Sequence, residues 1–249
     1  MGKHGFGVDI GGTGIKGAPV DLRKGKLSDD RFRVPTPQPA TPDAVAAVVR
    51  EVLDHFEWQG EFGCTFPAVV QHGMVRTAAN VDQSWIGTDA DKLLASATGR
   101  QPLVVNDADA AGVAEVRFGA AKDQDGVVLV STLGTGIGSA LLVDGQLVPN
   151  TELGHVELDG HDAESRASES ARERENLSWA DWAARLTRYY QHLENLFWPD
   201  LIVVGGGVSK NADQWLHLVE TRTELVPATL LNNAGIVGAA VLAAERHQH

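Results

Sequence analysis

Acidic, hydroxyl and cationic side chains surround a short glycine-rich segment near the start of the chain. Asp9 is followed by Gly11, Gly12 and Thr13, and Lys16 comes three residues after the threonine. Glycines let a backbone turn tightly and present its N–H groups to an anion, and a threonine adds a hydroxyl donor. The combination of carboxylate, bare backbone, hydroxyl and ammonium predicts a phosphate clamp. An ordinary tight hairpin turn is the structural alternative.

The same four residues, Gly-Thr-Gly-Ile, recur at positions 134–137. The first copy reads DIGGTGIKGAPVD and the second reads STLGTGIGSALLVD, so a glycine-rich hairpin is repeated. Gly134, Thr135 and Gly136 are therefore predicted to contact phosphate as well. The copies differ in charge, because Gly138 stands where the first copy has Lys16. This difference favours a charged contact at the first loop and an uncharged backbone cradle at the second.

Polar residues between and after the loops suit a sugar. Asn106 and Asp107 end an apolar stretch, and a carboxylate at a strand end can take a proton from a hydroxyl that attacks phosphorus. Asp107 is also placed to cap the helix that follows. Glu152 and His155 are spaced i and i+3, so one turn could direct both at one ligand, where a carboxylate beside an imidazole would hold a hexose.

Two nucleotide-binding motifs are disfavoured. Gly12, Gly14 and Gly17 satisfy GxGxxG, but that pattern requires the glycines to open a helix, and residues 17–34 show turns and strand-like stretches instead. No GxxxxGK[ST] string occurs. An NAD-binding oxidoreductase is kept only as a remote alternative.

The elements that must position these residues alternate between strands and helices. Strands are predicted at residues 5–10 and 17–21, with a third ending near Val34 after a turn at Lys24-Gly25-Lys26. Apolar residues from Val45 to Phe56, most of them valines, recur at helical spacing and predict a helix with one buried face. Thr41 and Pro42, just before them, resemble the N-cap and first turn of that helix. A strand at 103–105 and a helix at 110–118 complete the first round.

A second round repeats this order. Strands are predicted at 127–132, 139–143 and 146–148, a long helix at 176–197, an apolar strand at 201–204 before three glycines, and a final helix at 235–245. The repetition predicts two related α/β domains with a cleft between them. We expect the first domain to comprise residues 1–107, with the C-terminal helix 233–249 packing back on it, and the second domain to comprise residues 108–232. The charged segment 160–175 is predicted to be a solvated surface.

Composition limits the classes of function. The 249 residues are 43% hydrophobic and 22% charged, and 21 basic against 33 acidic residues give a net charge of −12. Such a balance disfavours nucleic acid and anionic membrane as partners. No window reaches the roughly 18 apolar residues of a membrane helix, so a cytoplasmic location is expected. The single cysteine, Cys64, is predicted to lie in the core.

Five motifs in order carry a family resemblance: DIGGTGIK, VND, LGTGIG, ELGH and VVGGGVS. From Gly5 to about Ala243 the chain resembles the sugar kinases of the ROK family (repressor, open reading frame, kinase). ANVDQSWIGTDAD, RERENLSWADW and NNAGIVGAA are more narrowly similar to bacterial polyphosphate glucokinases, also called polyphosphate/ATP glucomannokinases. The resemblance implies an actin/hexokinase-like (ribonuclease H-like) fold of duplicated α/β domains, phosphoryl transfer from inorganic polyphosphate to the 6-hydroxyl of glucose, a requirement for Mg²⁺ and a homodimer.

The resemblance also implies roles for residues. Asp107 becomes the general base, and the sugar ligands are Asn106, Glu152, His155 and Glu164, the last from the match of ESRAS to the family's Glu-Ala-x-Ala-Ser. The phosphate contacts are Asp9, Gly11, Gly12, Thr13, Lys16, Gly134, Thr135, Gly136, Gly206 and Gly207. The family's cysteine cluster CxCGxxGC is missing, so neither a structural zinc site nor another set of metal-ligating residues is expected.

The donor is open at this point. ATP-dependent glucokinase or glucomannokinase is the alternative, with an adenine pocket near residues 205–209. Polyphosphate would need a track of cations, for which the candidates are Lys16, Lys24, Lys26, Arg166, Arg172, Arg174 and Lys210. A sugar-responsive repressor of the same family is disfavoured, because only eight residues precede Asp9 and leave no room for a helix-turn-helix.

Overall fold

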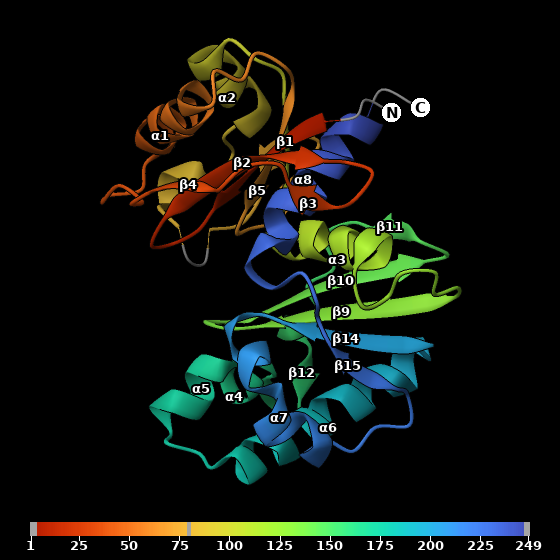
Figure 1. Cartoon of the computed structure of the whole chain (residues 1–249). Helices are drawn as coiled ribbons and strands as arrows, with labels where there is room; N and C mark the ends of the chain where they lie inside the picture. The colour runs from red at the N-terminus through yellow and green to blue at the C-terminus, as the bar shows by residue number, and fades with distance from the viewer. Residues whose placement is uncertain (1–3, 79–80, 247–249) are drawn as a thin grey trace. The chain divides into compact units, whose positions relative to one another are not determined.

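Each half of the chain is built around one mixed β-sheet in the computed structural model, which describes residues 4–78 and 81–246 (Figure 1). The chain divides into a first unit of residues 1–114 and 233–249 and a second unit of residues 115–232. This division falls inside helix α3 (Asp107–Phe118), whereas the boundary expected from the sequence lies at the start of that helix.

The sheet of the first unit has the order β3-β2-β1-β5-β8, with β4 also paired to β2. β1 and β2 are antiparallel, while β1, β5 and β8 run parallel. Parallel strands end at the same edge of a sheet, so the first glycine loop and the Asn106–Asp107 pair emerge from one edge. The strands are β1 (His4–Ile10), β2 (Ile15–Asp21), β3 (Lys26–Leu27), β4 (Phe32–Val34), β5 (Phe62–Phe66) and β8 (Pro102–Asn106), and a small hairpin adds β6 (Val70–Gln71) and β7 (Met74–Val75). The third strand predicted to end near Val34 is two short strands, β3 and β4.

Helices α1 (Pro42–His55) and α2 (Ala90–Thr98) contribute to the core of this unit, with η1 (Gln83–Trp85) nearby. The valine period correctly predicted α1, which begins at Pro42 after Thr41, although the Thr41 side chain makes no capping hydrogen bond. Alternate residues of β1, namely Phe6, Val8 and Ile10, enter this core. Cys64 is buried in it, as expected.

Helix α8 (Ala234–Glu245), blue in Figure 1, packs against β1 and β5. The contact is backbone to backbone: a Cβ added to Gly7 would lie 1.9 Å from the Ile236 carbonyl oxygen, and one added to Gly63 would lie 1.9 Å from that of Ala239. Only glycine strands facing a helix of small residues allow this approach.

The sheet of the second unit repeats the pattern, with the order β11-β10-β9-β14-β15. β9 and β10 form an antiparallel hairpin around the second glycine loop, and β14 pairs parallel to β9 and β15. The strands are β9 (Val127–Leu133), β10 (Ile137–Val143), β11 (Gln146–Val148), β14 (Leu201–Gly205) and β15 (Leu225–Pro227), with β12 (Glu157–Leu158) and β13 (His161–Asp162) as a separate ribbon. The prediction of two related α/β units is confirmed.

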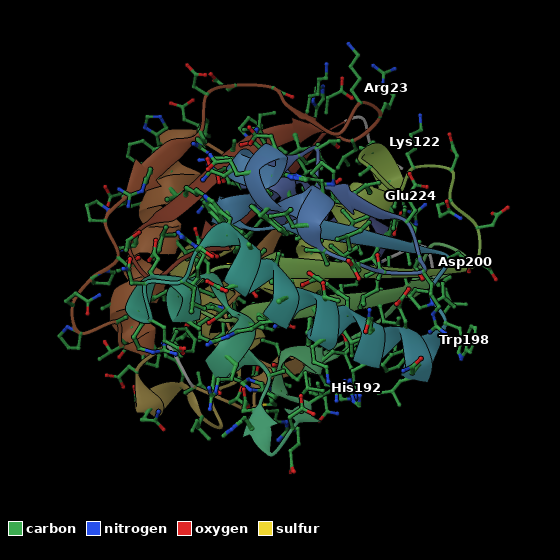
Figure 2. The ribbon with its side chains drawn as sticks, turned by 90° about the horizontal axis from the view of Figure 1, so that it is seen from below. Arg23, Lys122, His192, Trp198, Asp200 and Glu224 are labelled. Atoms are coloured by element: carbon green, nitrogen blue, oxygen red, sulfur yellow. The ribbon has the colours of Figure 1, made fainter. Side chains whose placement is uncertain are left out.

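The core of this unit lies under helix α6 (Trp179–Phe197), which buries Trp182, Leu186, Tyr189, Tyr190 and Leu193. Ser178 caps α6 by accepting from the Asp181 N–H, so the helix begins three residues later than the predicted start at 176. It ends at Phe197, and the capping residue Trp198 adopts a left-handed φ of 48° and is 70% exposed at the end of α6 (Figure 2).

The segment 160–175 is more structured than expected. It forms α4 (Glu164–Ala167) and α5 (Glu169–Arg174), and buries Ala163, Ala167 and Ala171. The predicted solvated surface describes only part of this segment, because Ala163 and Ala167, which lie between the charged residues, pack in the core with α6. The remaining elements are η2 (Leu153–His155), η3 (Gly207–Asn211), α7 (Ala212–Trp215), η4 (Leu216–Leu218) and η5 (Leu231–Asn233).

Candidate active site

A row of polar side chains crosses four neighbouring strands beside the first glycine loop. In the strand register Asp9 pairs with Thr65 on one side and with Lys16 on the other, and Lys16 pairs with Arg33. The Thr65 hydroxyl donates to Asp9 Oδ1 at 2.8 Å, and Lys16 Nζ lies 2.9 Å from Asp9 Oδ2. The acid and the cation expected to form a phosphate clamp are therefore adjacent.

The first loop is a closed hairpin with an open tip. The Gly11 N–H donates to the Gly14 carbonyl oxygen at 3.1 Å, and the Thr36 hydroxyl donates to the Gly11 carbonyl oxygen. A Cβ added to Gly12 would meet nothing within 4 Å. The loop continues into strand β2, which shows that the GxGxxG match lacks the helix a dinucleotide site requires.

Asn106 and Asp107 stand where β8 passes into α3. The Asn106 amide oxygen accepts from the N–H groups of Ala108 and Asp109, at 2.8 and 3.1 Å, and its amide nitrogen donates to the Ala68 carbonyl oxygen at 3.2 Å. Asn106, 7% exposed, thus makes the cap that was expected of Asp107. Asp107 is the first residue of the helix, and its Oδ1 accepts from the Ala108 N–H at 2.8 Å.

In the second unit, the second glycine loop is held by the segment that follows β13. The Gly134 N–H donates to the Gly136 carbonyl oxygen at 3.0 Å, and Ser170 contacts the loop twice, donating its N–H to the Gly134 carbonyl oxygen and its hydroxyl to that of Thr135. Glu164 Oε2 accepts from the Ile137 N–H at 2.7 Å. The loop predicted to be an uncharged cradle therefore has a carboxylate against it.

Three predicted sugar ligands of the second unit, Glu152, His155 and Glu164, lie in one cluster with a further acid, Asp162. His155 Nδ1 lies 2.8 Å from Asp162 Oδ2, and its Nε2 lies 3.9 Å from Glu152 Oε2. The charge of Glu164 acts on both Glu152 and His155. Asp162 was missed because no motif in the sequence singles it out; the structure places it in β13, opposite Glu157.

The cluster shifts the protonation of its members. The hydrogen bond to Asp162 raises the pKa of His155 above its ordinary value, burial opposes this, and the charges of Glu164, Asp162 and Glu152 add to the rise. Burial also raises the pKa of the Glu152 carboxyl, with His155 opposing and Glu164 adding to the shift. His155 is therefore disposed to be protonated and to donate a hydrogen bond from Nε2.

Gly206 and Gly207 follow β14. Gly206 has φ of 89°, and a Cβ there would lie 2.0 Å from the Leu133 carbonyl oxygen, so only glycine fits. This requirement accounts for Gly206 structurally. The phosphate roles of both glycines stay predictions.

The cations proposed for a polyphosphate track are dispersed. Both Lys24 and Lys26 lie at the end of β2 opposite to Lys16: Lys24 is in the turn after β2, and Lys26 begins β3, where it pairs with Asp21. In the second unit, Arg172 stacks over the Trp179 ring at 4.0 Å, Arg166 contacts His161, Arg174 donates to the Ser165 carbonyl oxygen, and Lys210 lies in η3. Lys24 and Lys26 are thus poor candidates for a track that begins at the first loop.

The described residues contain neither a ready metal-binding cluster nor a membrane-spanning helix. Within residues 4–78 and 81–246, no cluster of three or more His, Cys, Asp or Glu side chains could hold a metal ion. In the same part of the chain no helix has the length and apolar character needed to cross a bilayer.

Comparison with known proteins places the chain among sugar kinases. It is 54% identical to a polyphosphate glucokinase of Mycobacterium tuberculosis (strain CDC 1551 / Oshkosh) over 96% of this chain and 91% of the relative. The crystal structure of the inorganic polyphosphate/ATP-glucomannokinase of Arthrobacter sp. strain KM superposes with a TM-score of 0.94 at 56% identity, covering 99% of this chain and 100% of that one.

A ROK family glucokinase of Streptomyces griseus, solved with glucose and AMPPNP, shares the fold at 24% identity, with a TM-score of 0.84 over 97% of this chain and 99% of that one. The model of the ROK family matches residues 5–173. The chain belongs to the ROK family.

Proposed function

We propose that this chain is a polyphosphate glucokinase, which transfers the terminal phosphoryl group of inorganic polyphosphate to the 6-hydroxyl of glucose. The similarity to polyphosphate glucokinases over nearly the whole chain supports the activity. The observation that carries the mechanism is that Asp107 and the first glycine loop with Lys16 emerge from one edge of one sheet.

In this proposal Asp107 is the general base. The Ala108 N–H orients its carboxylate, which accepts the proton of the 6-hydroxyl as that oxygen attacks the terminal phosphorus. A bond forms between the sugar oxygen and phosphorus, the bond from phosphorus to the bridging oxygen breaks, and polyphosphate leaves one unit shorter.

In this proposal the sugar ligands are Asn106, Glu152, His155 and Glu164. Carboxylates accept hydrogen bonds from sugar hydroxyls, and a protonated His155 donates one. Asp162 acts on the sugar only through His155, whose ring it orients at 2.8 Å. The phosphate contacts are the N–H groups of Gly206, of Gly207 and of both loops, except those of Gly11 and Gly134, which close the two hairpins; Thr13, Thr135 and Lys16 contribute their side chains.

The proposed activity implies Mg²⁺, and the residues present fit it. Mg²⁺ is usually held by one or two carboxylates plus substrate phosphates and waters, rather than by a protein cage. Asp9, whose side chain is 20% exposed beside the loop, would hold it. When bound, the ion neutralises charge that develops on the phosphoryl oxygens.

Substitution of the proposed base tests the mechanism. Asp107→Asn should lower kcat for glucose 6-phosphate formation by roughly two to four orders of magnitude, the usual contribution of general base catalysis. Asp43→Asn is the matched control, because Asp43 is also an acid in the first turn of a helix of the same unit but is exposed on α1. Near-normal turnover in Asp107→Asn with folding preserved would refute the assignment.

An ATP-dependent glucokinase or glucomannokinase is the second candidate, because the similar Arthrobacter protein is named for both donors and for both sugars. A polyphosphate donor contacts more cations than ATP, so its use should fall more steeply with salt. Equal salt dependence of the KM values for the two donors would count against a cationic track.

A homodimer, which rests on the resemblance to the family, and a cytoplasmic location, which rests on the apolar pattern of the sequence, belong to the same proposal. Sedimentation of the purified protein would test the first, and fractionation of cells would test the second.

A further inference from the structure

We infer that Arg33 is a further ligand of the donor's phosphate chain and makes the first glycine loop selective for a polyanionic donor. The inference rests on the proposed function. It is carried by the position of Arg33 beside the loop, which was not apparent from the sequence, together with its charge and its donor groups.

Strand pairing places Arg33 beside the loop although it comes 17 positions after Lys16 in the sequence. Arg33 on β4 is paired directly with Lys16 on β2, so the two side chains project from the same face of the sheet. The Arg33 guanidinium reaches the loop itself, where Nη2 donates to the Thr13 carbonyl oxygen at 2.7 Å and lies 3.4 Å from the Thr13 hydroxyl.

The two cations differ in how far their charge is compensated. Lys16 forms an ion pair with Asp9 at 2.9 Å, and the side chains of both are about one-fifth exposed. Arg33 is exposed and, among residues 4–78 and 81–246, contacts no acid; its partners are the uncharged oxygens of Thr13. A full positive charge therefore remains at the loop, and Arg33 carries it.

Gly14 makes room for this arginine. A Cβ at Gly14 would lie 2.3 Å from Arg33 Nε and 2.5 Å from Nη2, so any other residue would displace the guanidinium. The equivalent glycine of the second loop, Gly136, makes room for Glu164, whose Oε2 would lie 2.2 Å from such a Cβ. The repeated glycines thus accommodate a cation at one loop and an anion at the other.

The geometry of arginine suits a chain of phosphates. A guanidinium has five N–H donors in a planar fork that can bind two phosphate oxygens at once, and within the described residues only Nη2 donates to the protein. The anchored Nη2 fixes the plane of the fork beside the loop. Its remaining donors are placed to take a phosphate next to those bound by the loop N–H groups.

The test compares Arg33→Gln and Arg33→Lys with Arg23→Gln. Arg23, labelled in Figure 2, is an exposed arginine of the same unit that follows Asp21, at the end of β2 opposite to Lys16. Two readouts are used: the KM for polyphosphate, for ATP and for glucose, and the equilibrium affinity for inorganic tripolyphosphate at several salt concentrations.

We expect Arg33→Gln to raise the KM for polyphosphate about tenfold, with a smaller rise for ATP and none for glucose, as a lost charge-assisted bond requires. Tripolyphosphate affinity should fall by a similar factor, and its salt dependence should weaken by about one phosphate contact. Arg33→Lys should be intermediate, because it keeps the charge but not the fork. Arg23→Gln should match the wild type.

Unchanged tripolyphosphate affinity in Arg33→Gln, or an equal loss in Arg23→Gln, would overturn the inference, as would a wild type that does not bind tripolyphosphate. If the wild type uses ATP alone, the proposed donor is wrong. The tripolyphosphate measurement still decides the role of Arg33 in that case, because it needs no turnover.

Discussion

Gly63→Ala should destabilise the first unit because it separates α8 from the sheet. The new Cβ would lie 1.9 Å from the Ala239 carbonyl oxygen and 2.2 Å from its carbonyl carbon, whereas ordinary van der Waals contact begins at 3.4 Å. Both partners are backbone, so no side-chain rotation relieves the overlap. Helix and strand must move apart by about 1.5 Å.

The magnitude follows from the cost of overpacking. Enlarging a residue in a close-packed core costs about 1–3 kcal/mol, and the value for Gly63→Ala should be near the upper limit because α8 also touches β1 backbone to backbone at Gly7. At roughly 2–4 °C per kcal/mol for a chain of this size, the Tm should fall by about 6–12 °C.

Differential scanning calorimetry measures this fall, with Gly12→Ala as the matched control. A Cβ at Gly12 meets nothing within 4 Å, so that variant should keep its Tm while it loses donor affinity at the loop. Gly63→Ala should also lower activity, because Gly235 at the start of α8 lies against Asp9. A Gly63→Ala protein that melts within about 1 °C of the wild type would refute the reasoning.

Three further substitutions test the site and its supports. Asp162→Asn should lower the pKa of His155, because the hydrogen bond that the His155 ring donates to Asp162 is the main cause of the raised pKa. NMR titration of the His155 ring, assigned with His155→Gln, measures this pKa, and an unchanged value would contradict the cluster. In the wild type the contribution of the His155–Asp162 pair to the free energy of unfolding is fully present below pH 6.5, the ordinary pKa of histidine, and is lost as pH rises through the raised pKa of His155. Glu115→Ala should lower the free energy of unfolding, measured by urea denaturation, by about 3 kcal/mol, because the buried carboxylate accepts hydrogen bonds from the N–H groups of residues 120, 229 and 230. A loss no greater than that of Glu115→Gln would contradict this reasoning. Thr65→Val should lower the free energy of unfolding by about 1.5 kcal/mol, because it removes the hydroxyl that donates a hydrogen bond to Asp9. An unchanged midpoint of urea denaturation would count against that bond.

Features set by local spacing could be predicted from the sequence. The valine period gave the correct extent of α1, and the duplicated glycine hairpins correctly indicated two α/β units. The C-terminal helix was also predicted, but the reason why its residues are small was not apparent from the sequence. Helix α8 is rich in alanine and glycine because it lies against Gly7 and Gly63 of strands more than 170 residues earlier.

Features set by distant pairing could not be predicted. Arg33 belongs to the first loop only through the register of β4 on β2, and a proline-rich segment after Val34 offers no local sign of that register. Glu164 was predicted as a sugar ligand, but its bond to the Ile137 N–H depends on how α4 packs beside the loop. The helix cap was assigned to the wrong neighbour, since Asp107 and Asn106 are both good capping residues and only the structure distinguishes them.

The most direct test of the proposed function is a coupled assay of glucose 6-phosphate formation by the purified protein, with polyphosphate and ATP supplied in separate reactions. We predict glucose 6-phosphate in the reaction with polyphosphate as the only donor, in an amount matching the phosphate units consumed. No product with polyphosphate, from a folded protein supplied with Mg²⁺, would contradict the proposal.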